Sequence, residues 1–174
     1  DEEKYKNKMR VVQVDKMEDM HEKAEEFKGC DQYFCCLGVM TSAGKEMLQK
    51  VDLEYPTAFA KLAKENNCTR FTYTSSVGAS PKAWGIYMKI KGQAEEALKE
   101  IGLQNLSLIR PGLVTQRGER TRWMEKCASY VPFIAKITCL NVARAMIENS
   151  ILSESAEETL ENKDLLEIVK KSEL

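Results

Sequence analysis

The chain has 174 residues, of which 43% are hydrophobic and 30% are charged, a composition typical of one globular domain. Its formal net charge is −1, so electrostatics give no reason to expect a nucleic acid or an anionic membrane as partner. No apolar run approaches the roughly 18 residues that a membrane-spanning helix needs. We therefore expect one domain over residues 1–174, with no nucleic-acid partner and no membrane span.

Cysteine usage points to thiols in a reducing compartment. There is a single histidine, and the cysteines form no Cys-x-x-Cys motif, so the sequence offers no ligand set for zinc. We expect buried, reduced thiols rather than disulfides, and a cytoplasmic protein, with the nucleus or an organelle matrix as alternatives. The six cysteines are Cys30, Cys35, Cys36, Cys68, Cys127 and Cys139.

The first predicted elements alternate between strand and helix. Residues 9–15 form a short β-branched run, which predicts a strand. Residues 17–29 have apolar positions at helical spacing and predict an amphipathic helix that ends at Gly29. Residues 30–38 are mostly apolar and predict a buried strand that ends at Gly38.

The middle of the chain continues this alternation. Residues 41–46 are typical of a loop, and residues 52–67 predict a helix. Asp52 is the expected N-cap of that helix, because Pro56 then falls near the first turn, where a missing N–H costs little. Residues 69–76 predict a third strand, which ends in two serines.

The last third of the chain has the same pattern. Residues 83–101 predict a long helix ended by Gly102, and residues 106–112 predict a strand stopped by Pro111. Two further helices are predicted at residues 122–133 and 141–152. Residues 159–171 predict a short strand or turn followed by a final helix.

Alternating apolar strands and helices predict an α/β fold, with a parallel sheet covered on both faces. Ligands bind such sheets beyond the carboxyl ends of the strands. Those ends are predicted at Asp15, Gly38, Ser75-Ser76 and Pro111-Gly112, most of which are polar or glycine, as a ligand-binding edge requires.

Tyr87 and Lys91 form a Tyr-x-x-x-Lys pair at the start of the predicted helix 83–101. Residues four apart share one helix face. A free phenol has a pKa of about 10, which a neighbouring ammonium lowers because it favours the phenolate. A hydroxyl of Ser75 or Ser76 could orient a carbonyl group against the phenol. The set predicts proton transfer to a carbonyl oxygen as hydride arrives, or the reverse; the alternative is an ordinary exposed pair.

These residues lie within a wider resemblance. A serine followed by Tyr-x-x-x-Lys on a strand–helix unit resembles the signature of short-chain dehydrogenases/reductases. The segments DEEKYKN, YFCCLG, VDLEY, SSVGA, YMKIKGQAE, IRPG, VARAM and LENK occur in the same order in the Tat-interacting-protein-type oxidoreductases, an atypical branch of that superfamily. The resemblance covers nearly the whole chain and is weakest in residues 115–140, the variable substrate side. It implies a Rossmann-type doubly wound parallel sheet and an NADP-dependent oxidoreductase acting on an unidentified carbonyl or alcohol substrate.

The resemblance also implies roles for individual residues. Tyr87 would be the proton donor or acceptor, and Lys91 would hold the nicotinamide ribose and tune Tyr87. Ser76 would orient the carbonyl, with Ser75 as a stand-in. Asp15 would contact the adenine side of the cofactor. The ribose would lie beside Cys36, Leu37 and Gly38, and the nicotinamide beside Pro111, Gly112 and Leu113.

One part of the family pattern does not occur in this sequence. The family begins with a strand, a Gly-x-x-Gly-x-x-Gly turn and a helix that holds the pyrophosphate, so we expect roughly 50 further residues upstream. The alternatives are a chain completed by another subunit, or a rearranged sheet. Without those elements, strand 9–15 lacks a neighbour, the edge of strand 30–38 is exposed, and NADP binding by this chain alone is expected to be weak. A non-catalytic regulatory or assembly protein that binds protein partners is therefore the alternative function.

Overall fold

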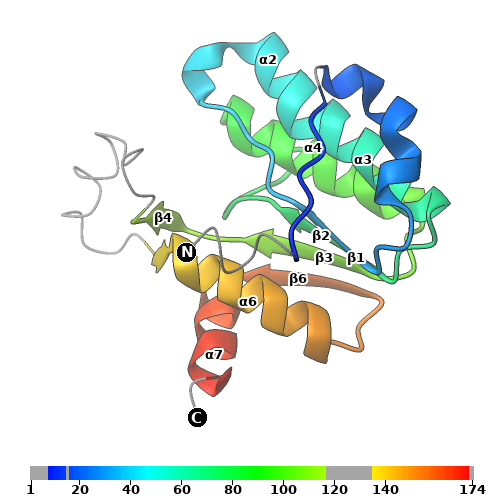
Figure 1. Ribbon diagram of the computed structural model, residues 1–174. Coiled ribbons are helices and arrows are strands. Elements are labelled where there is room, and N and C mark those ends of the chain that lie inside the picture. Colours follow the sequence, from blue (N-terminus) through cyan, green and yellow to red (C-terminus); the bar gives the residue numbers. More distant parts are fainter. Residues whose placement is uncertain (1–7, 15, 117–134, 173–174) are drawn as a thin grey trace.

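The computed structural model describes residues 8–14, 16–116 and 135–172. Its centre is a four-stranded parallel sheet in the order β1-β2-β3-β6 (Figure 1). The fold is therefore α/β with a parallel sheet, as the alternating pattern predicts. The strands are β1 (Gln32–Cys35), β2 (Arg70–Thr74), β3 (Leu106–Arg110) and β6 (Glu157–Glu161).

One face of the sheet is covered by helices from the first half of the chain. Helix α2 (Lys45–Gln49) continues through a π-helical turn, η3 (Lys50–Glu54), into α3 (Tyr55–Glu65), and α4 (Ile86–Ile101) lies beside them (Figure 1). Gly102 ends α4 in the left-handed conformation, with φ 68°, as the sequence predicts. Apolar side chains of the sheet and helices fill this layer, among them Tyr33, Cys35, Ala60, Phe71, Tyr73, Ala94, Leu98 and Leu108.

The opposite face is covered by α6 (Cys139–Leu152) and α7 (Asn162–Ser172) (Figure 1). Thr138 caps α6, because its side-chain oxygen accepts a hydrogen bond from Asn141 N at 3.1 Å. Both helices and β6 confirm the sequence expectations for residues 141–152 and 159–171. The core of this layer consists of Ile109, Ile137, Val142, Ala145, Met146, Leu165 and Val169.

The prediction of a strand at residues 9–15 is wrong for the described part of that segment. Residues 9–14 form no strand and are largely exposed, and Asp15 lies outside the described residues. A β-branched run becomes a strand only when a neighbour accepts its backbone hydrogen bonds, and no described strand lies beside it.

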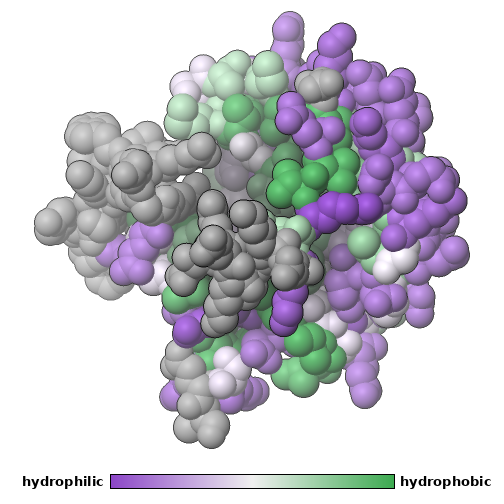
Figure 2. All heavy atoms as spheres, viewed as in Figure 1, coloured by the Kyte–Doolittle hydropathy of each residue, from purple (hydrophilic) through white to green (hydrophobic). Residues whose placement is uncertain are grey.

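The edge of β1 opposite β2 is open among the described strands, as expected for an apolar segment without its neighbour. Phe34, in the middle of β1, is 37% exposed. An apolar groove runs along this edge, lined by Val14, Met17, Met20, Phe27, Phe34, Cys35, Cys36, Leu37 and Phe59. The outer side of α6 is also apolar, and Figure 2 shows hydrophobic residues gathered over its C-terminal end.

Several predicted boundaries differ from the structure. Residues 17–27 form a 3₁₀ helix, η1 (Met17–Phe27), rather than an α-helix. The helix predicted at residues 52–67 begins earlier, because the turn at Gly44 leads directly into α2. The strand predicted at residues 30–38 has four residues, and the helix predicted at residues 122–133 lies outside the described residues. The sequence gives no sign of the small parallel sheet formed by β4 (Leu113–Thr115) and β5 (Lys136–Thr138).

Among the described helices, none is long and apolar enough to cross a membrane.

Gly92 lies where α4 meets the loop that follows β2. A methyl group at Gly92 would lie 2.2 Å from the carbonyl carbon of Ser80 and 2.5 Å from the nitrogen of Pro81. The same loop is fixed by a hydrogen bond from Ser80 N to Met88 O at 3.1 Å. Glycine thus allows α4 to touch the backbone of this loop.

We expect Gly92→Ala to destabilise the protein by about 1–3 kcal/mol, because overpacking against backbone outweighs the gain of about 1 kcal/mol in helix propensity. Urea denaturation measures this difference. Gln93→Ala, at the exposed neighbouring position, is the control and should change stability by less than about 0.5 kcal/mol. A Gly92→Ala protein as stable as the parent would contradict the described contact.

Candidate functional site

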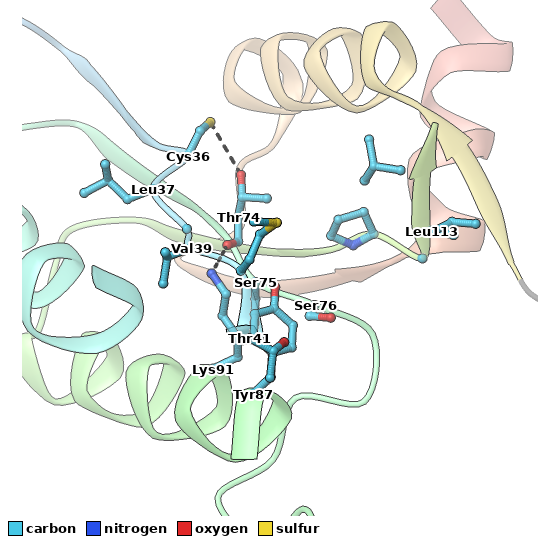
Figure 3. Close-up of a pocket in the computed structure, with 15 residues that line it drawn as sticks. Cys36, Leu37, Val39, Thr41, Thr74, Ser75, Ser76, Tyr87, Lys91 and Leu113 are labelled. Carbon is cyan, nitrogen blue, oxygen red and sulfur yellow. Dashed lines mark hydrogen bonds between the residues drawn. The ribbon is translucent and has the colours of Figure 1, made fainter. Parts of the chain in front are cut away.

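A cavity of about 340 Å³ opens at the carboxyl ends of β1, β2 and β3 (Figure 3). Parallel strands place their carboxyl ends at one edge, which brings together residues far apart in the sequence. The cavity contains all the predicted site residues except Asp15, which lies outside the described residues. Its lining includes Cys36, Leu37, Gly38, Ser75, Ser76, Tyr87, Lys91, Pro111, Gly112 and Leu113, together with Val39, Met40, Thr41, Thr74 and Val114.

Tyr87 and Lys91 reach this cavity from the first two turns of α4. Figure 3 shows both side chains rising from α4 toward the end of β2, where Ser76 lies. Tyr87 is half-buried, and Ser76 is partly exposed at the cavity. A phenol and a hydroxyl that share one cavity can both contact the oxygen of a bound carbonyl group.

Lys91 is buried, with 2% of its surface exposed. Its ammonium donates hydrogen bonds to Thr74 O at 2.9 Å and to Tyr73 Oη at 3.0 Å. It also forms an ion pair with Asp52 Oδ1 at 2.9 Å. Oδ1 accepts no hydrogen bond from the described residues, so this contact is an ion pair without hydrogen-bond geometry. An ammonium buried so deeply is stable only because these oxygens surround it.

Asp52 is the main site residue that the sequence analysis missed. It was expected as a helix N-cap, but it lies inside the π-helical turn η3 and is fully buried. Its Oδ2 accepts a hydrogen bond from Val39 N at 3.1 Å, in the segment that follows β1. Asp52 stands between Val51 and Leu53, but Lys50 and Glu54 flank them, so the local sequence carries no clear signal that this carboxylate is buried.

Tyr73 lies directly beneath Lys91. It donates a hydrogen bond to the backbone oxygen of Asp52 at 2.8 Å and accepts one from Lys91. Burial raises the pKa of Tyr73 well above its usual value, and the nearby Asp52 carboxylate raises it further. Tyr73 therefore remains protonated and serves as a fixed donor.

A second polar network supports the cavity from behind. Ser75 donates a hydrogen bond to Glu95 Oε1 at 2.5 Å, and Arg110 contacts both oxygens of Glu95, at 2.9 and 2.5 Å. The hydrogen bonds with Glu95 raise the pKa of Arg110 above its usual value. Arg110 also bonds Glu161 at 3.0 Å. Because the Ser75 hydroxyl is buried and engaged with Glu95, Ser76 is the serine of the pair that faces the cavity with its side chain partly exposed.

The expectation of buried thiols is only partly correct. Cys35 and Cys68 are buried, whereas Cys30, Cys36 and Cys139 are exposed, and all five are free thiols. Cys127 lies outside the described residues. Burial raises the pKa of Cys35 to about 11. Cys36 lies at the cavity and accepts a hydrogen bond from Thr74 Oγ1 at 3.5 Å.

Metal chemistry finds no support in the described part of the chain. No group of three or more histidine, cysteine, aspartate or glutamate residues there is arranged to hold a metal ion.

A family model described as NAD(P)H-binding matches residues 1–150. The chain belongs to the NAD(P)H-binding family. The chain is similar to the rat protein HTATIP2, with 32% identity over 185 residues, 99% of this chain and 75% of the rat protein. The mitochondrial protein FMP52 of Eremothecium gossypii is 36% identical over 94 residues, but the match covers 53% of this chain and 41% of the fungal protein.

Solved structures confirm the Rossmann-type architecture of this NAD(P)H-binding chain. MoeE5 in complex with UDP-glucuronic acid and NAD has a TM-score of 0.74 at 11% identity, over 87% of this chain and 62% of MoeE5. A putative NAD-dependent epimerase/dehydratase from Bacillus halodurans has a TM-score of 0.62 at 19% identity, over 85% and 72% of the two chains. At such identities the likeness concerns the fold alone.

Lys91→Met should destabilise this NAD(P)H-binding chain by about 3–5 kcal/mol, because it leaves the Asp52 carboxylate buried without its charge partner. Adding Asp52→Asn to that variant should recover part of the loss, since it removes the unpaired charge. Chemical denaturation of the single and double variants measures whether the double variant is more stable than Lys91→Met. Equal losses in both variants would show that the ion pair does not govern stability here.

The two adjacent cysteines should differ sharply in reactivity. Thiolates are the species that alkylating agents attack, so Cys35, buried and with its raised pKa, should resist iodoacetamide at pH 8. Cys36 should react, because it is exposed. Mass spectrometry of the alkylated native protein separates the two, with the urea-unfolded protein as the control in which both react. Labelling of Cys35 in the native protein would contradict its described burial.

Proposed function

We propose that this protein is an NADP-dependent oxidoreductase of the short-chain dehydrogenase/reductase type, which transfers hydride to or from a carbonyl or alcohol substrate. The observation that carries the proposal is the meeting of Ser76, Tyr87 and Lys91 at one cavity of an NAD(P)H-binding fold. The three residues come from a strand end and one helix face, so their convergence depends on the fold and not on sequence proximity.

The cavity fits the ribose and nicotinamide part of a dinucleotide. Its volume of about 340 Å³ lies at the lower end of the usual range for small-molecule sites. Cys36, Leu37 and Gly38 would flank the ribose at the end of β1. Pro111, Gly112 and Leu113 would flank the nicotinamide after β3. Gly112 is fixed there, because its N–H donates a hydrogen bond to Asn162 Oδ1 at 2.9 Å.

The side chains of the site would handle the proton. The bound dinucleotide supplies or accepts the hydride. Tyr87 would donate its hydroxyl proton to the carbonyl oxygen of the substrate, or remove a proton from an alcohol in the reverse direction. Ser76 would orient the same oxygen by a hydrogen bond. Lys91, one helix turn from Tyr87, would favour the phenolate through its positive charge.

The relatives support a nicotinamide cofactor more directly than the choice of NADP. Two of the similar proteins, MoeE5 and a dTDP-glucose 4,6-dehydratase, were each solved with NAD bound. The preference for NADP rests on the resemblance to the Tat-interacting-protein-type oxidoreductases. We propose a cytoplasmic location because free thiols suit a reducing compartment, with the nucleus or an organelle matrix as alternatives. Several fungal relatives are named mitochondrial.

Tyr87→Phe should abolish turnover, because no other described hydroxyl comes from the same helix face, and should leave NADPH affinity within a few-fold. Fluorescence titration with NADPH and thermal stabilisation by NADPH or NADH measure binding. Both should be measured on this chain and on a version extended by the upstream reading frame, with the tighter binding expected in the extended version.

Substrate screening by NADPH oxidation provides the activity readout for the same proteins. Gln93→Ala, on the exposed side of α4, is the matched control and should retain both properties. An extended protein without saturable binding of either nucleotide would refute the oxidoreductase proposal and favour a non-catalytic, protein-binding role.

A further inference from the structure

The ammonium of Lys91 and the carboxylate of Asp52 form an almost neutral unit at the base of the cavity. Asp52 is fully buried and Lys91 is 2% exposed, so water screens neither charge. Two N–H groups of Lys91 are already directed at Thr74 O and Tyr73 Oη. Its nitrogen also lies 2.9 Å from Asp52 Oδ1, as an ion pair. The position and the field of Lys91 therefore depend on Asp52.

We infer that Asp52 is a positioning residue: it fixes the Lys91 ammonium against β2 and offsets its charge, and so limits how strongly Lys91 favours the Tyr87 phenolate. Asp52 does not reach the substrate side of the cavity, because its carboxylate is fully buried beneath Gly38 and Val39. It acts through Lys91. The inference deepens the proposed function, since it concerns the same phenol, but it is testable without nucleotide or substrate.

Other charged and titratable groups around this unit come from three elements. Lys91 and Asp52 both act electrostatically on Cys35, and Asp52, Cys35, Tyr87 and Glu95 act on Tyr73. Glu95 is already paired with Arg110 through two hydrogen bonds, so Asp52 is the carboxylate that pairs with Lys91. The groups that face the Lys91–Asp52 unit are thus Tyr73 from β2, Cys35 from β1 with Cys36 directly after it, and Tyr87 and Glu95 from α4.

Removing either charge should shift the pH midpoint of Tyr87 ionisation in a defined direction. In Asp52→Asn the Lys91 charge is no longer offset, so the phenolate of Tyr87 should form at lower pH, by about one pH unit or more. In Lys91→Met the unpaired carboxylate opposes the phenolate, so the midpoint should rise. The double variant has neither charge, so its midpoint should lie between that of the parent, in which Lys91 still favours the phenolate, and that of Lys91→Met. A purely structural role for Asp52 predicts loss of stability in the variants, but not this order.

The experiment is an NMR titration of the full chain with ¹³C-labelled tyrosine side chains. The Tyr87 signal is assigned by its absence in Tyr87→Phe, which is also the control for the other five tyrosines. We expect the midpoint to increase in the order Asp52→Asn, parent, double variant and Lys91→Met. If Asp52→Asn does not fold, the comparison of Lys91→Met with the double variant still tests the inference, because removal of the carboxylate should lower the midpoint.

Two outcomes would overturn the inference. An unchanged or higher midpoint in Asp52→Asn would show that Lys91 loses its charge without Asp52, so that the carboxylate sustains the ammonium instead of limiting it. An unchanged midpoint between Lys91→Met and the double variant would show that Asp52 has no electrostatic reach to Tyr87. Neither outcome bears on whether the protein binds a nucleotide, so failure here is distinguishable from failure of the proposed function.

Discussion

The buried contact between Lys91 and Asp52 is the constraint on which the site depends. It joins α4 to the π-helical turn η3, and Thr74 and Tyr73 join both to β2. An ammonium can be buried at this depth only where oxygens replace its water, so the end of β2 and the turn at Asp52 must meet in one geometry. Tyr87 lies one turn before Lys91, and Ser76 lies two residues after Thr74. The contacts of Lys91 and Thr74 therefore also fix the positions of Tyr87 and Ser76.

A second contact extends the same helix face. Tyr87, Lys91 and Glu95 follow one another at intervals of four residues along α4, and Glu95 holds both Ser75 and Arg110. Arg110 directly precedes Pro111 and Gly112, so the wall of the cavity at β3 is tied to the wall at β2. Both polar contacts form within the chain, so they hold the walls of the cavity in place without a ligand.

The comparisons and the site answer different questions. The NAD(P)H-binding family and the Rossmann-type neighbours account for the sheet and for a ligand edge at its carboxyl ends. They do not account for chemistry, because one fold serves many reactions. The case for hydride transfer therefore rests on the phenol, the ammonium and the serine at the cavity. The open edge of β1 and the exposed apolar side of α6 belong to the fold and lie outside that case.

The sequence alone predicted the alternation of strands and helices, the parallel sheet, and the pair of Tyr87 and Lys91 beside Ser75 or Ser76. These follow from local patterns: apolar runs, glycine at helix ends and a four-residue spacing. Only the tertiary structure decided the role of Asp52, which looks like a helix cap in the sequence and becomes the partner of a lysine 39 positions away. It also decided that residues 9–14 form no strand and that the hydroxyl of Ser75, although Ser75 lines the cavity, is bonded to Glu95. A charge partner and a strand neighbour are supplied by distant parts of the chain, so no local pattern records them.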